Sequence, residues 1–302
     1  MIALVVDGGG TRTRLWLVQS ESRTCLHKLE KGPSNIGQVG EEGLHTLLQQ
    51  VVMEIPPAMP PDAIILGLAG VGREPERQKA LSAARRVFPQ AGVYVVTDAE
   101  LAYSAAFADG RHGILIIAGT GTIACYRTMV GHEFIRVGGW GPILGDEGGG
   151  AWIGREALRH CLLEWDGDEL SPLHATILRE MQLDTAMQIL TRVYLEKFSP
   201  RDWAKLAPHV FECAREDPGA RRILKNAAIE LVSLAERIAE KQLPDAHEIP
   251  LVVSGGIWQQ RDLMQPLMEE EFLLRNLPFV FTQPAAGPME GGLLLLEQLR
   301  HK

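Results

Sequence analysis

Three short turns that combine glycines with hydroxyl side chains constrain the fold of this chain most strongly. Asp7-Gly-Gly-Gly-Thr-Arg-Thr, Gly119-Thr-Gly-Thr and Ser254-Gly-Gly each follow a short apolar run with the character of a buried strand. A backbone without Cβ can approach phosphate oxygens closely, and successive N–H groups form a concavity that binds anions. One such turn alone fits an ordinary hairpin. Three of them together favour a phosphate-binding α/β protein.

The pattern of apolar residues predicts two lobes that open in the same way. A chain of 302 residues exceeds the size at which single cores usually stop growing. In both halves an apolar run is followed by a glycine turn and a second apolar run. The predicted strands are 2–6, 15–18, 64–68, 93–97, 113–118, 123–126 and 251–253. The predicted helices are 77–88, 155–165, 186–198, 223–241 and 289–300.

Composition and charge exclude several classes of protein. The formal net charge of −8 provides no basic stripe for nucleic acid. The longest apolar stretches fall far short of the roughly 20 residues that cross a bilayer, and the N-terminal residues lack a secretory leader, so we expect a cytoplasmic protein without a membrane partner. Four scattered cysteines without a CxxC pair, and histidines without ligand spacing, give no reason to assign a transition metal.

Neither common nucleotide-binding motif occurs in the sequence. There is no G-x-x-x-x-G-K-[ST] segment, and no predicted strand is followed by G-x-G-x-x-G. A P-loop or a Rossmann domain is therefore disfavoured.

Two aspartates stand where predicted strands end. Asp7 lies beside the first glycines, where a carboxylate can hold Mg²⁺ against the phosphates of a nucleotide; the alternative is a turn-forming aspartate. Asp98 follows a strand and begins a helix, a position from which it can act as general base toward a hydroxyl. The alternative is equally strong, because Thr97 and Glu100 spell a capping box and Asp98 can simply favour the helix N-terminus.

The segment from Gly138 to Trp152 surrounds two carboxylates and two indoles with many glycines. Such a loop can line a polar pocket in which aromatic rings stack on a sugar and the acids Asp146 and Glu147 accept hydrogen bonds from its hydroxyls. Alternatively, it is a flexible turn whose acids favour the start of the following helix.

With these residues assembled, the chain resembles the N-acetylglucosamine kinase and BadF/BadG/BcrA/BcrD ATPase family, within the actin, sugar-kinase and Hsp70 superfamily. The resemblance covers essentially the whole length. Its ordered motifs are D-G-G-G-T at Asp7, G-P-S-N at Gly32, G-L-A-G at Gly67, T-D-A at Thr97, G-T-G-T at Gly119, G-G-W-G at Gly138, G-D-E-G at Gly145 and S-G-G at Ser254.

The resemblance implies an α/β fold of two ribonuclease-H-like lobes, with mixed sheets flanked by helices and an ATP cleft between them. We expect an N-terminal lobe of residues 1–111 plus 287–302 and a C-terminal lobe of residues 112–286 with a helical insert. ATP and Mg²⁺ are the implied cofactors. A homodimer through the insert is one option, although core packing explains its amphipathic faces equally well.

The resemblance also assigns roles to individual residues. Asp98 is the implied catalytic base and Asp7 the implied metal ligand. The residues expected to bind the nucleotide are Gly8, Gly9, Gly10, Thr11, Gly119, Thr120, Gly121, Thr122, Gly255 and Gly256. The residues expected to bind the sugar are Asn35, Asp98, Gly139, Trp140 and Asp146.

Two departures affect the sugar site. Ala69 stands where relatives often have a hydroxyl residue, and Gly148-Gly149-Gly150 is unusually rich in glycine. The expected reaction is phosphorylation of N-acetylglucosamine to its 6-phosphate. The alternatives are a glucosamine or other hexosamine kinase, an ATPase that activates a radical 2-hydroxyacyl-CoA dehydratase or benzoyl-CoA reductase, and a sugar sensor without activity. Scattered cysteines speak against an iron–sulfur activator.

Overall fold

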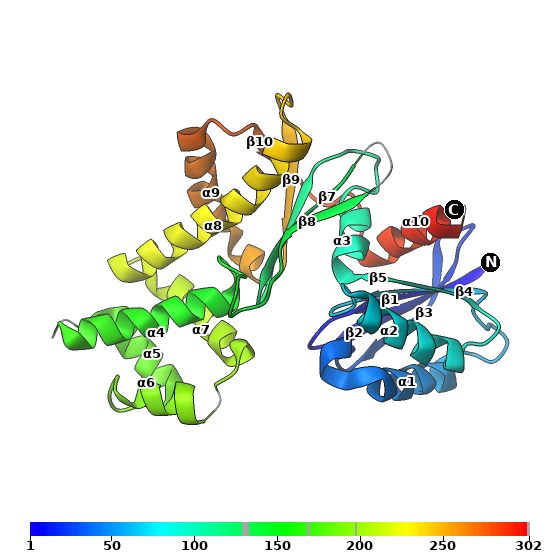
Figure 1. Ribbon diagram of the computed structural model, residues 1–302, viewed down its shortest axis with the longest axis horizontal. Helices are drawn as coiled ribbons and strands as arrows, with labels where there is room; N and C mark the ends of the chain where they lie inside the picture. Colours follow the sequence, from blue (N-terminus) through cyan, green and yellow to red (C-terminus); the bar gives the residue numbers. More distant parts are fainter. Residues whose placement is uncertain (129–132, 168–169, 197, 301–302) are drawn as a thin grey trace. The chain divides into compact units, whose positions relative to one another are not determined.

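The computed structural model describes residues 1–128, 133–167, 170–196 and 198–300 of the chain (Figure 1). These residues form two compact units. Unit 1 comprises Met1–Arg111 and the chain from Gln283 onward, and unit 2 comprises His112–Thr282. Unit 2 is thus inserted in the sequence of unit 1.

Unit 1 contains a mixed five-stranded sheet in the order β3-β2-β1-β4-β5. Its strands are β1 (Ile2–Gly8), β2 (Thr13–Gln19), β3 (Thr24–Lys31), β4 (Ala63–Leu68) and β5 (Gly92–Thr97). The first three strands form an antiparallel meander, while β1, β4 and β5 run parallel. The carboxyl ends of the three parallel strands therefore meet at one edge of the sheet.

Helices cover both faces of this sheet. They are α1 (Ile36–Glu54), α2 (Glu74–Val87), α3 (Asp98–Ala106) and α10 (Pro288–Arg300). Leu4 and Val6 belong to the core under α1 and α2, whereas Ala3 and Val5 pack in the core that α10 completes with Leu293. This alternation of side chains along β1 is the period of two that a strand buried on both faces must have.

Unit 2 contains a second mixed five-stranded sheet in the order β10-β9-β6-β7-β8. Its strands are β6 (Ile114–Ala118), β7 (Thr122–Arg127), β8 (Phe134–Gly138), β9 (Ile249–Ser254) and β10 (Phe279–Phe281). Again an antiparallel meander is extended by parallel strands, because β9 pairs in parallel with both β6 and β10. The two sheets repeat one plan, as the two similar openings in the sequence predict.

Helices make up most of the rest of unit 2. They are α4 (Gly150–Asp166), α5 (Pro172–Met181), α6 (Gln188–Leu190), the π-helical turn η1 (Thr191–Leu195), α7 (Pro200–Cys213), α8 (Pro218–Gln242), the 3₁₀ turn η2 (Ile257–Gln260) and α9 (Arg261–Arg275). The largest core cluster of the described chain lies here and is built mainly from α4, α7, α8 and the central strands.

One predicted helix of unit 2 is wrong in extent. Residues 186–198 do not form one regular helix: three α-helical residues pass into the π-helical turn η1, which ends at Leu195. Residue 197 lies outside the described residues. Bulky, exposed Tyr194 and Leu195 give this segment little apolar burial to hold it as a regular helix.

The predicted helix 155–165 lies within α4, which already begins at Gly150. Within the described ranges, no helix has the length and apolar character needed to cross a membrane.

Candidate active site

Three polar segments of unit 1 come together where its parallel strands end. Gly8 of β1 is paired in register with Leu68 of β4, and Leu68 with Thr97 of β5. The first glycine turn, the Ala69-Gly70 turn and Asp98 therefore follow one another across the same sheet edge. In open α/β sheets this edge is where ligands bind.

Asp7 presents its carboxylate beside this edge. It lies two residues after Val5, so its side chain points to the face of the sheet covered by α3 and α10. Burial raises the pKa of Asp7, and the charges of Arg14 and Arg12 oppose this rise. No residue in the described chain donates a hydrogen bond to its carboxylate. Its oxygen lone pairs are left for a cation or for water.

Asp98 is the first residue of α3. The predicted capping box is confirmed: the Thr97 side chain accepts from the amide of Glu100 at 3.1 Å, and the Glu100 carboxylate accepts from the amide of Thr97 at 2.8 Å. Thr97 and Glu100 therefore cap the helix, and the Asp98 carboxylate accepts from the adjacent Ala99 amide at 3.0 Å.

The environment of Asp98 favours its protonated form. Burial raises the pKa of Asp98 to about 6, and the negative charges of Asp7 and Glu100 add to the rise, while the hydrogen bond from Ala99 opposes it. A carboxylate with this pKa is a stronger base than an exposed aspartate and is still largely ionised at neutral pH.

The first glycine turn is locked to two neighbouring segments. The amide of Ser34 donates to the carbonyl of Gly9 at 3.0 Å, and the amide of Ala69 donates to the carbonyl of Gly8 at 2.8 Å. Gly8 itself is buried, and a Cβ on it would stand 2.2 Å from Ser34 Oγ. Gly9 and Gly10 are half-buried and Thr11 is exposed, so the accessible part of this turn runs from Gly9 to Thr11.

Asn35 caps the next helix and faces the Ala69-Gly70 turn. Its Oδ1 accepts from the amide of Gly37 at 2.9 Å, which caps α1. Gly70 has a φ of +86°, and a Cβ there would lie 2.6 Å from Asn35 Oδ1. Within the described chain, Asn35 Nδ2 donates no hydrogen bond to the protein. The side chain thus keeps a free amide donor at the same sheet edge.

In unit 2 the second and third glycine turns are neighbours. Ile117 of β6 pairs in parallel with Ser254 of β9, so both strands end at one edge. The start of α4 holds the Gly119 turn in place: the amides of Gly150 and Ala151 donate to the carbonyls of Gly119 and Thr120 at 2.8 and 2.9 Å. This fixes the turn against a helix N-terminus.

These turns open into a cavity of about 390 Å³ within unit 2. Small and apolar side chains of α7 and polar side chains of η2 form the other walls. The lining residues are Gly119, Thr120, Gly150, Ala204, Ala207, Pro208, Phe211, Gly256, Ile257, Gln259 and Gln260. A Cβ on Gly119 or Gly256 would meet no atom within 4 Å, so both backbones face open space. The volume falls within the range of small-molecule sites.

A glycine-rich loop follows β8 and carries the remaining predicted residues. Asp146 is only 8% exposed and has a φ of +63°; its Oδ1 accepts from the amide of Gly141 at 3.2 Å. Burial raises the pKa of Asp146, and backbone hydrogen bonds from Gly141 and Thr122 oppose the rise. Gly139, with a φ of +69°, donates its amide to the carbonyl of Thr122 at 2.8 Å. The loop is therefore tied to the Gly119–Thr122 turn and is not a loose linker.

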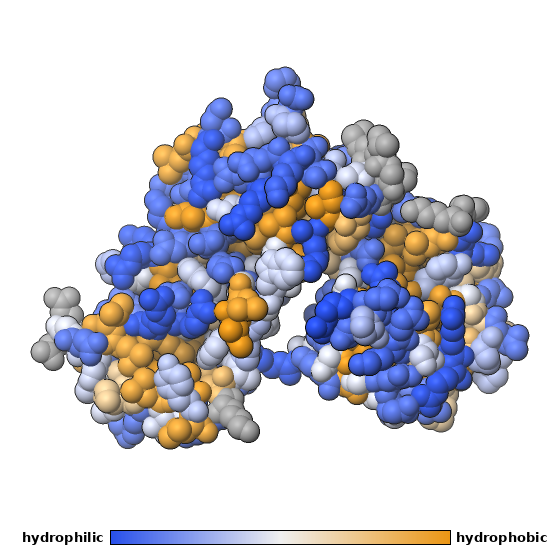
Figure 2. Space-filling view, viewed as in Figure 1, coloured by the Kyte–Doolittle hydropathy of each residue, from blue (hydrophilic) through white to orange (hydrophobic). Residues whose placement is uncertain are grey.

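Aromatic and aliphatic side chains of the same loop are exposed. Trp140 is 65% exposed and its ring lies 4.5 Å from the guanidinium of Arg136. Ile143 and Leu144 are each 82% exposed, and Figure 2 shows a hydrophobic patch where this loop meets the start of α4. Exposed apolar groups beside a polar site are typical of a surface that receives a ligand.

The structure groups the predicted residues by unit. Asp7 to Thr11, Asn35 and Asp98 lie along one sheet edge of unit 1, and the remaining predicted residues lie around the linked turns of unit 2. The α7 wall of the cavity was missed. Its signal in the sequence is Ser199-Pro-Arg-Asp, which forms a second capping box at the start of α7.

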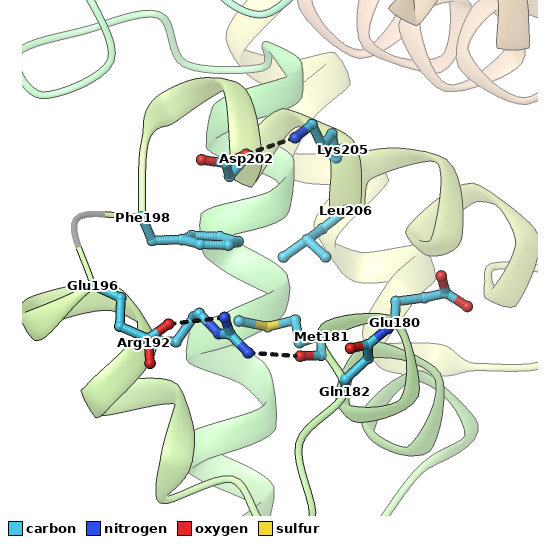
Figure 3. A pocket seen from close by; sticks show the side chains of 9 residues that line it. All are labelled: Glu180, Met181, Gln182, Arg192, Glu196, Phe198, Asp202, Lys205 and Leu206. Carbon is cyan, nitrogen blue, oxygen red and sulfur yellow. Dashed lines mark hydrogen bonds and ion pairs between the residues drawn. The ribbon is translucent and has the colours of Figure 1, made fainter.

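A second cavity of about 410 Å³ in unit 2 contains none of the predicted site residues (Figure 3). Its charged groups are already paired: Arg192 contacts Glu196 at 2.8 Å and donates to the carbonyl of Met181, while Lys205 contacts Asp202 at 2.7 Å. The cavity is thus a polar groove whose charges neutralise one another, and nothing in it marks a second reaction centre.

Comparisons with known proteins identify relatives over nearly the whole chain. The model of the BadF/BadG/BcrA/BcrD ATPase family matches residues 4–287. An N-acetylmuramic acid/N-acetylglucosamine kinase of Clostridium acetobutylicum is 30% identical, with 83% of this chain and 84% of the relative covered. An N-acetyl-D-glucosamine kinase of Dictyostelium discoideum is also 30% identical, with 92% of this chain and 91% of the relative covered.

Solved structures share the fold. A candidate N-acetylglucosamine kinase from Chromobacterium violaceum superposes with a TM-score of 0.77 at 30% identity, and 98% of each chain is covered. The two mixed sheets flanked by helices are therefore those of the sugar-kinase and actin-like ATPase fold, as predicted.

Proposed function

Because the chain belongs to the BadF/BadG/BcrA/BcrD ATPase family, we propose that it is an ATP-dependent kinase that phosphorylates a hydroxyl of an amino sugar. N-acetylglucosamine, converted to its 6-phosphate, is the substrate we expect. The observation that carries the proposal is Asp98, a half-buried carboxylate at a sheet edge whose helix is capped by other residues.

Residues of unit 2 bind the nucleotide in this proposal. Gly119 and Gly256 face the cavity without side chains, and the α7 wall of Ala204 and Ala207 leaves room for a flat base. The Gly119–Thr122 turn supplies backbone N–H groups and hydroxyls for phosphate oxygens. Within unit 1, the segment Gly9–Thr11 offers donors of the same kind. Gly255, with a φ of +100°, makes the sharp turn that brings Gly256 to the cavity.

Asp7 suits a magnesium ion that accompanies ATP. Its carboxylate accepts no hydrogen bond from the described residues, and within the described chain no three His, Cys, Asp or Glu side chains form a metal cluster. Mg²⁺ is commonly held by one or two carboxylates together with substrate phosphates. Bound there, the ion would neutralise charge on the phosphates.

Asp98 accepts the proton of the attacking sugar hydroxyl. Proton removal strengthens the oxygen as a nucleophile toward the terminal phosphorus, and ADP leaves with the bridging oxygen. The glycine and threonine turns donate hydrogen bonds to the transferred phosphoryl group, whose charge they stabilise in the transition state.

Two side chains with free polar or aromatic faces are suited to contact the sugar. Asn35 Nδ2 is a free donor that a hydroxyl or acyl oxygen can accept, and Trp140 offers an indole face to the sugar ring. Asp146 is largely buried, so its direct contribution is an oxygen at the loop surface, and its structural contribution is the shape of the Gly139–Gly141 backbone.

An ADP-release assay with a panel of hexoses and amino sugars tests the proposal. We expect turnover with N-acetylglucosamine and much less with glucose. Asp98→Asn should lose roughly 10²- to 10⁴-fold in kcat while ATP still binds. Turnover of the panel by wild type and by Asp98→Asn at the same rate would show that Asp98 is not the base.

The alternatives have less support. Both curated relatives are kinases, and an ATPase activator of a radical dehydratase needs clustered thiolates. Cys125 and Cys161 are buried, and burial raises the pKa of Cys161 to about 12, which disfavours the thiolate that binds iron. A glucosamine or other hexosamine kinase differs only in the acyl contact, which the sugar panel resolves. Cytoplasmic location and a homodimer stay predictions.

A further inference from the structure

The catalytic aspartate of the proposed reaction follows directly on the first residue of a reciprocal helix cap. One carboxylate oxygen of Glu100, Oε2, accepts from both the amide and the hydroxyl of Thr97, at 2.8 and 3.0 Å. In return the Thr97 hydroxyl accepts from the amide of Glu100 at 3.1 Å. These bonds fix the orientation of the Thr97 peptide and that of the Thr97 side chain.

This arrangement fixes the backbone immediately before Asp98. Thr97 is the last residue of β5 and is paired with Leu68, while Asp98 is the first residue of α3. The direction in which the Asp98 side chain leaves the chain depends on the strand-to-helix turn at Thr97, which has φ and ψ of −73° and 154°. Glu100 is half-buried and lies within 4.0 Å of Arg77 on α2, so the carboxylate is itself held.

We propose that Glu100 is a positioning residue for phosphoryl transfer: by holding Thr97 at both its amide and its hydroxyl, it fixes Asp98 in the orientation that accepts the proton of the sugar hydroxyl. This rests on the proposed function of Asp98. Misplacement of a reacting group by about 1 Å can cost up to 10²-fold in rate, so a cap that stabilises a helix only modestly can matter much more for turnover.

The chain offers a matched control. Ser199 and Asp202 form the same capping box at the start of α7, in which Asp202 Oδ2 accepts from the Ser199 amide at 3.1 Å. Asp202 takes no part in the proposed chemical step. Removing either carboxylate takes away one reciprocal cap, but only that of Glu100 precedes a reacting group.

The test compares Glu100→Ala, Glu100→Gln and Asp202→Ala of the full chain in steady-state kinetics and thermal melting. Glu100→Ala should lose about 5- to 20-fold in kcat with the KM for ATP changed less than about twofold. Glu100→Gln keeps an oxygen that accepts from Thr97 and should stay within about threefold of wild type. Asp202→Ala should lower the Tm by a similar few degrees yet keep kcat; because α7 forms a wall of the nucleotide cavity, any kinetic effect of this variant should fall on the KM for ATP.

Three results would overturn the inference. They are a folded Glu100→Ala with wild-type kcat, a Glu100→Gln that loses as much kcat as Glu100→Ala, and an Asp202→Ala that loses as much kcat as Glu100→Ala. If Glu100→Ala does not fold, Thr97→Val serves instead, since it removes only the hydroxyl and should lower kcat about two- to fivefold with Thr97→Ser near wild type.

Failure of the inference can be told from failure of the proposed function. An inactive Asp98→Asn together with a fully active Glu100→Ala would leave Asp98 as the base and remove only the role of Glu100. An active Asp98→Asn would remove the base itself.

Discussion

Asp146 lies directly against Gly121, so that a Cβ on this glycine would stand 2.1 Å from Asp146 Oδ2. Because Asp146 is buried and held by the amide of Gly141, it cannot move aside without breaking the loop that carries Trp140. The second glycine of the Gly119–Thr122 turn is therefore required by packing as well as by any ligand.

We expect Gly121→Ala to destabilise the protein by about 1–3 kcal/mol and to reduce turnover, because the added methyl group must displace Asp146. Thermal melting and ADP release measure both effects. Gly119→Ala is the control: its Cβ would meet no atom within 4 Å, so the Tm should hold while the KM for ATP rises several-fold. Equal Tm values for Gly121→Ala and wild type would contradict the packing argument.

The pH dependence of the reaction should follow Asp98. Since the pKa of Asp98 is raised to about 6 and the base must be ionised, kcat/KM for the sugar should rise with pH, bend near pH 6 and level off above it. An acid limb that bends near pH 4 would show that the base is an ordinary exposed carboxylate or another group.

The buried charge of Asp98 should also lower the free energy of unfolding. Folding raises the pKa of Asp98 from 3.8 to about 6. Below pH 3.8 the carboxyl is protonated in both the folded and the unfolded state and costs no stability. As the pH rises to about 6 the unfolded state ionises more readily, so the free energy of unfolding falls, and it stays lower above pH 6. Asp98→Asn should therefore raise the Tm at pH 8, by roughly 2–4 °C, while it lowers kcat. At pH 3 the gain should vanish; a gain that is the same at both pH values would exclude charge burial as its cause.

Substitutions can separate the two expected functions of Asn35, which are to cap α1 and to donate a hydrogen bond to the sugar. Asp caps a helix as well as Asn does, so Asn35→Asp should keep the Tm but lose the Nδ2 donor and raise the KM for the sugar about tenfold. Asn35→Ala should lose both the cap, worth about 1 kcal/mol, and the donor. An unchanged sugar KM in Asn35→Asp would place the donor outside the sugar site.

Trp140 tests the sugar contact of unit 2. Its exposed ring contributes little to the core, so Trp140→Ala should leave the Tm within about 1 °C of wild type and raise the KM for the sugar roughly 5- to 50-fold. Trp140→Phe keeps an aromatic face and should restore most of the affinity. If Trp140→Ala binds sugar normally, the indole serves only to cover Arg136.

The glycine turns and the parallel strands could be predicted from the sequence because their signals are local. Three of the apolar runs end at turns of glycine and hydroxyl residues, and the spacing of Thr97 and Glu100 alone predicts their capping box. The same spacing left the role of Asp98 open. Only the structure shows that Thr97 and Glu100 complete the cap without it.

The capping box at Ser199 is a local signal for the start of α7, but the position of α7 beside the cavity could not be predicted, because it depends on contacts between residues distant in sequence. Ala204 and Ala207 are ordinary helix residues in sequence, and Pro208 argues against a helix at this place. Their position beside Gly119 follows from tertiary packing of α7 on α4. The helix predicted over residues 186–198 is wrong for the opposite reason. The local spacing of apolar residues there is helical, but in the folded protein Tyr194 and Leu195 are exposed and bury little apolar surface.

The last helix has a consequence for the order in which the chain can be assembled. Leu293, Leu295 and Leu296 of α10 complete the core that holds Ala3 and Val5 of the first strand. During synthesis this core cannot be completed until α10 has been made, whereas unit 2 ends at Thr282, before α10 begins. The strand that carries Asp7 is thus made well before the helix that covers one of its faces.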